Sequence, residues 1–384
     1  MIPADLRARL VALRHDLHAH PELAFEEHET QRRLRAALPD GIEVRAVAGT
    51  GLLARIPGTQ RGTPTVALRG DIDALPITEA TDAPFASTVA GRMHACGHDM
   101  HATWTVGAAH LLARTPAAGD VLILLQPAEE VGRGATAVLA EGVLDQVSAM
   151  AGAHVDLRFP IGKIVADAGP LAASTDEFTI DVVGRGGHAA RPHEARDPIP
   201  AAATIATALR QLTPDQRSGG DPAVCTVTQF HAGTAWNVIP ERATLCGTLR
   251  ATTPASRALL GAAVHRIAET TAAAWGVEAR VTLTAGPPPL INAAEPIAWS
   301  RAVIAELLGP DALVPLPEPN LAGEDFASYA ERMPACFLRI GARREHEPIV
   351  GAHSPRFLPS DDALAIGAAV LAGWARRAVV ALGR

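Results

Sequence analysis

Cysteine and aromatic residues are scarce in this sequence, and no segment is dense in positive charge. Four cysteines in 384 residues make a poor disulfide scaffold, and a chain of this length can bury a core without one. Only five Trp, one Tyr and eight Phe occur, so stacking platforms for nucleic-acid bases are not expected. Lys and Arg number 34 against 41 Asp and Glu, with no run that could follow a phosphate backbone. These features argue against a nucleic-acid-binding protein.

Long apolar segments are also missing. The longest nearly uninterrupted one, residues 363–375, is shorter than the roughly 18 residues that span a bilayer. The N-terminus turns charged at once and lacks the apolar region of a signal peptide. We therefore expect a cytoplasmic protein with no membrane partner. Hydrophobic residues make up 48% of the chain and charged residues 20%, which is typical of a folded protein.

The apolar pattern predicts two domains. Strand-like runs at 65–69, 121–126 and 149–155 alternate with helical segments, which favours an α/β domain with helices on both faces of a sheet. Between residues 175 and 286 the expected order becomes β-α-β-β-α-β, the arrangement of a ferredoxin-like α+β module. We predict that this module, 175–286, is inserted into a discontinuous domain made of 1–174 and 287–384.

The densest chemical signal is a cluster of metal-binding residue types. His94, Cys96, His98 and His101 fall within eight residues, together with Asp99. Thiolate and imidazole suit zinc, manganese, nickel or cobalt, and Asp99 is a candidate for orienting one of the ligands. Cys96 and His98 are two apart, so an extended segment would present both on one face. Taken alone, the cluster is equally compatible with a His-rich loop around a buried cysteine.

Further candidates lie just past predicted strands. Glu129 and Glu130 follow the strand 121–126, where α/β enzymes place their sites, although a solvated acidic turn would look the same. His154 ends a strand, His353 follows the strand 336–340, and His188 lies in the inserted module. A lone histidine is more often structural than functional, but several of them at such loop positions favour a shared site.

The glycines at 184–187 resemble a dinucleotide-binding loop only superficially. Such a loop needs a helix that begins at the glycines. Pro192 and Pro198 delay the next helix by about ten residues, so we reject nucleotide binding and a dehydrogenase function with it.

Taken together, the motifs resemble those of the binuclear-metal amidohydrolases, the family of hippurate hydrolases, N-acyl-amino-acid aminoacylases and auxin-conjugate hydrolases. The resemblance runs nearly end to end, through the following segments: His18-Ala-His-Pro-Glu22, Arg69-Gly-Asp71-Ile-Asp73, Cys96-Gly-His98-Asp99, Gln126-Pro-Ala-Glu129-Glu130, Gly152-Ala-His154, Gly184-Arg-Gly-Gly-His188, Trp236-Asn237, Gly323-Glu-Asp-Phe326 and His353-Ser-Pro355.

The resemblance implies a zinc-peptidase-like α/β/α catalytic domain with an inserted lid and dimerisation domain. It implies a role for each matching residue: two divalent metal ions (Zn, Mn, Ni or Co) on Cys96, His98, Glu130, His154 and His353; Glu129 as general base; His188 at the reacting carbonyl; Asn237 and Arg250 as substrate contacts; and Asp73 as a carboxylate behind the ligands. Other branches begin the metal site with His-x-Asp, and this chain has Asp71-Ile-Asp73 instead, so Asp71 is not expected to be a ligand.

The expected reaction is hydrolysis of the amide bond of a small-molecule N-acyl or N-aroyl amino acid by a homodimer or higher homo-oligomer. A metallo-dipeptidase or carboxypeptidase using the same metals is the nearest alternative. A metal-binding protein without catalysis is a third, and the presence of both Glu129 and His188 argues against it.

Overall fold

The computed structural model describes residues 2–215 and 222–383, which divide into two compact units. Unit 1 contains the described residues up to 169, with 292–317 and those from 328 onward, whereas unit 2 contains 170–291 and 318–327. The sequence pattern divided the chain at 174/175 and 286/287, whereas the compact units divide at 169/170 and 291/292. The segment 318–327, which the sequence pattern placed in the larger domain, belongs to unit 2.

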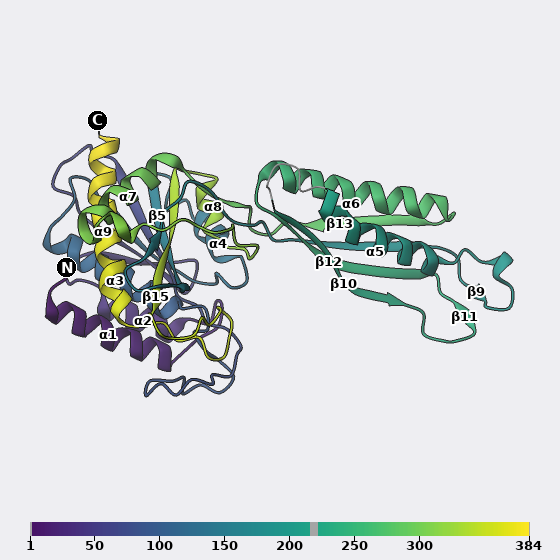
Figure 1. The fold of residues 1–384 in the computed structure, drawn as a ribbon, viewed down its shortest axis with the longest axis horizontal. Helices are drawn as coiled ribbons and strands as arrows, with labels where there is room; N and C mark the ends of the chain where they lie inside the picture. Colours follow the sequence, from purple (N-terminus) through teal and green to yellow (C-terminus); the bar gives the residue numbers. More distant parts are fainter. Residues whose placement is uncertain (1, 216–221, 384) are drawn as a thin grey trace. The chain divides into compact units, whose positions relative to one another are not determined.

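A sheet that contains β5 and β15 forms the centre of unit 1 (Figure 1). It has seven strands in the order β1-β2-β4-β3-β5-β15-β6. Strands β3, β4, β5 and β15 are parallel, whereas β1, β2 and β6 pair antiparallel with their neighbours. The inner strands are buried on both faces, as near-continuous apolar runs require. The strands are β1 (Glu43–Val47), β2 (Gly51–Ile56), β3 (Thr65–Asp71), β4 (Val121–Gln126), β5 (Val147–Pro160), β6 (Ile164–Val165) and β15 (Ala335–Arg343).

Helices cover this sheet, which confirms the predicted α/β class. They are α1 (Ala4–Ala19), α2 (His28–Ala37), α3 (His98–Arg114), α4 (Gly134–Ala140), α7 (Ala294–Leu308) and α9 (Asp362–Leu382), with two short turns, η3 (Pro310–Ala312) and α8 (Ala327–Ala330). The fully buried Trp104 of α3 and Trp374 of α9 are the largest side chains of the core. Helix α3, which is packed between α1, α9 and the sheet, carries residues of the candidate site at its N-terminus.

Helix α9 contains the longest apolar run of the sequence, residues 363–375, and extends beyond it. It has 21 residues and continues past Arg376 and Arg377, so by length and composition alone it could cross a membrane. Leu364, Leu371 and Trp374 are nevertheless fully buried, and the helix packs against α3 and α7. In this structure α9 is a core helix of unit 1.

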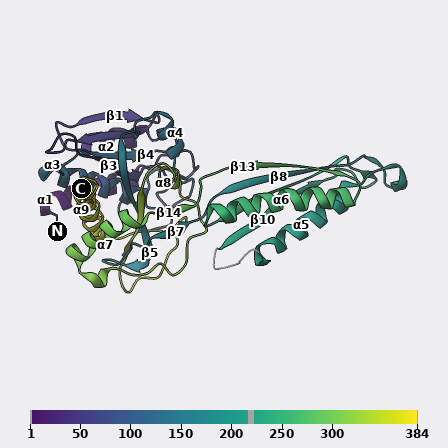
Figure 2. The ribbon, with the colours of Figure 1, turned by 90° about the horizontal axis from the view of Figure 1, so that it is seen from above.

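Unit 2 is built on a four-stranded antiparallel sheet in the order β10-β12-β8-β13. Two helices lie side by side on one face of it (Figure 2), and the chain order is β-α-β-β-α-β. The elements are β8 (Asp176–Val183), α5 (Pro198–Asp215), β10 (Ala223–Ala232), β12 (Arg242–Ala251), α6 (Pro254–Ala274) and β13 (Glu278–Thr284), with the short pieces β7 (Gly169–Ala172), β9 (Gly187–His188), η1 (Pro192–Glu194), β11 (Val238–Ile239) and β14 (Leu290–Asn292).

Candidate metal centre

Four separate segments of unit 1 bring metal-binding side chains to one place beside the parallel strands. Cys96 and His98 stand at the start of α3, the pair Glu129 and Glu130 follows β4, and His154 lies in β5. A fourth segment, residues 344–361 between β15 and α9, carries His353. Potential ligand atoms of Cys96, His98 and His154 lie within 4.8 Å of one another, as do those of Cys96, Glu130 and His353, and those of His98, Glu129 and Glu130.

A left-handed turn at Gly97 aims Cys96 and His98 at the same place. The backbone of Gly97 has φ 90°, a conformation that glycine adopts without a steric penalty. A Cβ atom there would meet Val155 Cγ1 at 2.4 Å. The two side chains therefore converge through a turn into a helix, and not through the extended segment expected from their spacing.

Asp73 organises the other side of the centre. Its Oδ1 accepts hydrogen bonds from the backbone N–H of Glu129 at 3.0 Å and from Nδ1 of His98 at 3.1 Å. Its Oδ2 accepts the backbone N–H of Glu130 at 3.0 Å. With Nδ1 as the donor, His98 presents the lone pair of Nε2 to the site. One buried carboxylate thus orients one imidazole and two neighbouring peptide groups.

His154 is oriented by its own strand. Its Nδ1 lies 2.6 Å from the carbonyl oxygen of Val155, so Nδ1 carries the proton and Nε2 is left as the ligand atom. That Nε2 lies 3.3 Å from Sγ of Cys96. The adjacent Val155 N–H donates to Nε2 of His101 at 2.9 Å, and Nδ1 of His101 contacts Asp71 at 2.6 Å.

Carboxylates surround Nε2 of His98, the ring nitrogen that does not contact Asp73. Its Nε2 lies 3.7 Å from Asp71 Oδ2, 3.8 Å from Glu129 Oε2 and 3.7 Å from Glu130 Oε1. The other oxygen of Glu130 lies 3.4 Å from Nε2 of His353. Among the described residues, neither His98 Nε2 nor Glu130 Oε1 has a hydrogen bond of ordinary geometry, although both atoms are buried. Buried polar atoms without partners are rare, and these have the chemistry of metal ligands.

Burial sets the electrostatics of these groups. It raises the pKa of the Cys96 thiol well above its usual value, with the Glu130 charge adding to the effect, and raises the pKa of Glu130 to about 7. Burial lowers the pKa of His154 well below its usual value. For His98 burial acts in the same direction, but Asp71 and Asp73 outweigh it and raise the pKa. A divalent cation would reverse the cost of ionising the thiol and the carboxylate.

Asp99 does not orient a ligand as predicted. It is the second residue of α3 and faces α1, where its Oδ2 accepts hydrogen bonds from Arg14 Nε and His18 Nδ1, both at 2.9 Å. Successive helix residues point about 100° apart, so Asp99 turns away from the centre when His98 faces it. Although burial opposes ionisation, the nearby Arg14 and His18 cations hold the pKa of Asp99 far below its usual range.

Sequence reasoning missed the pairing of Asp71 with His101. The two residues form a buried contact beside His98, and Arg69 also donates to Asp71, at 2.5 Å. Ligand atoms of Asp71, His98 and His101 lie within 4.8 Å of one another. The usable signal was the helical spacing of His98 and His101, because residues three apart share a helix face.

The remaining predicted site residues stand on unit 2. His188 of β9 pairs with Val238 of β11, and the backbone oxygen of Asn237 accepts the N–H of Ala189 at 3.1 Å. His188 and Asn237 are therefore neighbours in the chain's fold. Arg250 belongs to the far end of β12, eight residues beyond Arg242, which is about 26 Å at the usual rise of a strand.

Comparison with known proteins decides the family. The model of peptidase family M20/M25/M40 matches residues 67–377. The chain belongs to this family. An N-acetylcysteine deacetylase of Bacillus subtilis (strain 168) is 40% identical over 371 residues, which are 95% of this chain and 96% of the relative. IAA-amino acid hydrolase ILR1-like 2 of Arabidopsis thaliana is 38% identical over 374 residues, 95% of this chain and 84% of the relative.

A solved M20 structure supports the same assignment. A dinuclear metal binding peptidase of the M20 family from Bacillus subtilis superposes with a TM-score of 0.87 at 36% identity, covering 99% of both chains. The resemblance inferred from the motifs is thus confirmed, as are the α/β fold of this M20 chain and its nature as a metal-dependent hydrolase. Its cytoplasmic location and its dimeric state stay predictions.

Proposed function

We propose that this M20 chain hydrolyses the amide bond of small N-acyl amino acids, using two divalent metal ions held by Cys96, His98, Glu130, His154 and His353. The products are a carboxylate and a free amino acid. The observation that carries the proposal is the buried Nε2 of His98, which makes no hydrogen bond among the described residues and has three carboxylates 3.7–3.8 Å away. Such an excess of buried negative charge is stabilised by bound cations, and imidazole and carboxylate are both metal ligands.

Glu129 is the proposed general base. Divalent cations at such a centre supply Lewis acidity toward water and toward the amide carbonyl. As the water oxygen attacks the carbonyl carbon, Glu129 takes the water proton, and it then delivers this proton to the nitrogen as the C–N bond breaks. The Glu129 side chain is 11% exposed, so it stays reachable by substrate, and Asp73 fixes its backbone.

His188 is the proposed donor to the developing oxyanion. Its Nδ1 accepts the N–H of Ala190 at 3.1 Å, so the neutral ring carries its proton on Nε2, which is the tautomer that can donate to a negative oxygen. The side chain is exposed. This geometry supports the role without placing His188 relative to the metal centre.

We propose a homodimer because one chain keeps two of the proposed substrate contacts apart. His188 and Asn237 lie past one end of the unit 2 sheet, where β9 and β11 are seen in Figure 1. Arg250 lies near the other end, beside the pair Leu249 and Asp176. The stretch of β12 from Arg242 to Arg250 alone spans about 26 Å, which is too long for one small substrate to bridge. Joint action of His188 and Arg250 on one substrate would therefore need two copies of the chain.

The test is a substrate panel with and without a chelator. N-acetyl amino acids, N-benzoyl amino acids and dipeptides are compared by chromatography of the released amino acid. The names of the relatives, an N-acetylcysteine deacetylase and an IAA-amino acid hydrolase, support starting with N-acyl substrates. Turnover of dipeptides alone would favour the metallo-dipeptidase alternative. Bound metal with no turnover of any amide would refute a hydrolase function.

The role of Glu129 is tested with Glu129→Gln. We expect turnover to fall by about 10²–10⁴-fold while the metal content, measured by elemental analysis, stays at the wild-type level. Glu43→Gln is the control, because that side chain is 70% exposed on β1. Loss of metal from Glu129→Gln would make this residue a ligand, and near wild-type turnover would contradict its role as the base.

A further inference from the structure

The segment that carries His353 has little regular structure of its own. Residues 344–361 contain no helix or strand, and His353 adopts φ 66°, a left-handed conformation that costs about 1–3 kcal/mol outside glycine and persists only when the surroundings hold it. The backbone N–H of His353 donates to the carbonyl of Ala95 at 2.8 Å. After His353, the carbonyl of Pro355 accepts the N–H of Ala80 at 2.8 Å, and Phe357 is fully buried. Residues 344–349, before His353, are exposed.

The guanidinium of Arg343 holds the first end. Arg343 is the last residue of β15, and its Nε donates to the carbonyl of Leu157 in β5 at 2.9 Å. One of its terminal nitrogens donates to the carbonyls of Glu345 at 2.9 Å and Glu347 at 3.0 Å, with a longer contact of 3.4 Å to Arg344. The start of the segment therefore folds around Arg343, which ties it to the strand that carries His154.

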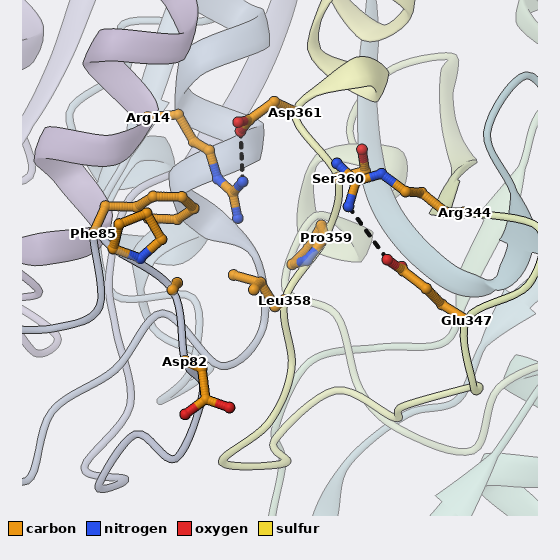
Figure 3. Close-up of a pocket in the computed structure, with 11 residues that line it drawn as sticks. Arg14, Asp82, Phe85, Arg344, Glu347, Leu358, Pro359, Ser360 and Asp361 are labelled. Atoms are coloured by element: carbon orange, nitrogen blue, oxygen red, sulfur yellow. Dashed lines mark hydrogen bonds and ion pairs between the residues drawn. The ribbon is translucent and has the colours of Figure 1, made fainter.

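Packed side chains hold the part of the segment after His353, where Phe357 is buried in the core, but not residues 344–349, which are exposed. A pocket of about 360 Å³ lies between residues 82–85 and both ends of the segment, with Arg344 and Glu347 at one end and residues 358–361 at the other (Figure 3). At that second end Asp361 accepts a hydrogen bond from Arg14 at 2.6 Å. Since residues 344–349 are exposed and open space adjoins Arg344 and Glu347, hydrogen bonds and not core packing determine the path of this first part of the segment.

We propose that Arg343 is a positioning residue for one of the two metal ions. Arg343 fixes the start of the 344–361 segment against β5 and so keeps the His353 side chain close to Cys96 and Glu130. The group of Cys96, His98 and His154 contains no residue of this segment, so only the ion that uses His353 depends on Arg343. This inference rests on the proposed metal centre and adds a residue that touches neither ion.

The test measures zinc binding and not turnover. Chelator-stripped wild type, Arg343→Ala and Arg343→Lys are titrated with Zn²⁺ against a fluorescent chelator. For Arg343→Ala we expect one ion to bind as in wild type and the other about 10–100-fold more weakly, as for other groups that orient metal ligands. Lysine reaches fewer carbonyls with a point charge, so Arg343→Lys should fall between the two.

Arg158→Ala is the matched control. Arg158 follows Leu157 in β5, but its guanidinium pairs with Asp156, so its loss should leave both zinc affinities unchanged. A double-mutant cycle with His353→Ala tests the route: if Arg343 acts through His353, then adding Arg343→Ala to His353→Ala weakens zinc binding no further.

The outcomes separate the inference from the proposed function. Wild-type affinity for both ions in Arg343→Ala would overturn the role of Arg343. Equal weakening of both ions, with a lowered melting temperature, would overturn it too, because the effect would then be a general loss of structure. If His353→Ala itself keeps both ions, the proposed ligand set is wrong, and the role of Arg343 falls with it.

Discussion

Replacing Asp73 by asparagine should loosen the metal centre without removing a ligand. The asparagine side chain keeps the shape of the aspartate but has one acceptor oxygen in place of two. Its oxygen could still serve His98 and Glu129, but the amide nitrogen would then face the N–H of Glu130, which in the wild type donates to Oδ2 of Asp73 at 3.0 Å. A buried donor left without a partner costs about 1–3 kcal/mol.

That cost should appear mainly as weaker metal binding. Residues that orient metal ligands typically contribute 10–100-fold to affinity, and we expect Asp73→Asn to lose zinc affinity by about that factor in competition with a chelator. Asp156→Asn is the control, because Asp156 is also a buried carboxylate of unit 1, paired with Arg158. Unchanged affinity for both ions in a folded Asp73→Asn would refute the idea that Asp73 organises the centre.

Two further predictions concern stability. Gly97→Ala should lower the free energy of unfolding by about 1–3 kcal/mol through left-handed strain alone, and it should also lower the zinc content. Thermal melting and elemental analysis measure the two effects. Gly351→Ala is the control and should be nearly neutral in both, because a Cβ there meets nothing within 4 Å. Burial opposes the protonation of His18, but Asp99 and Glu79 raise its pKa to about 9. This folded-state pKa lies above the unfolded value of 6.5, so protonated His18 stabilises the folded state. Its contribution to the free energy of unfolding, about 3 kcal/mol, is complete below about pH 6.5 and is lost as the pH rises through about 9. Urea unfolding of chelator-stripped wild type and His18→Gln across this range should show the two converging at high pH, and a constant difference would contradict the prediction.

The sequence predicted the elements that are apolar and sharply bounded. The bounds of β4 agree with the predicted run 121–126, because turn residues flank this strand. The hairpin of β1 and β2 was not predicted. β1 is largely exposed, so its residues give no alternating apolar signal, and its pairing with β2 depends on the rest of the sheet.

The sequence predicted which residues make up the candidate site, but not which neighbouring residues hold them in place. Each metal-binding residue type stood in a recognisable motif, and the structure brings the expected groups of unit 1 together. Asp99 was misplaced because its spacing was read without knowing that α3 begins at His98. Asp71, the partner of His101, and Leu157, one partner of Arg343, lie on distant strands, and no local pattern encodes such contacts.

The insertion of unit 2 between His154 and His353 has a consequence for biosynthesis. About two hundred residues separate the fourth proposed ligand from the fifth, and ribosomes add about 5–20 residues per second, so His353 emerges about 10–40 s after His154. During that interval the nascent chain offers only four of the five proposed ligands: Cys96, His98, Glu130 and His154. The second ion can therefore be captured in full only near the end of translation, once β15 has joined the sheet.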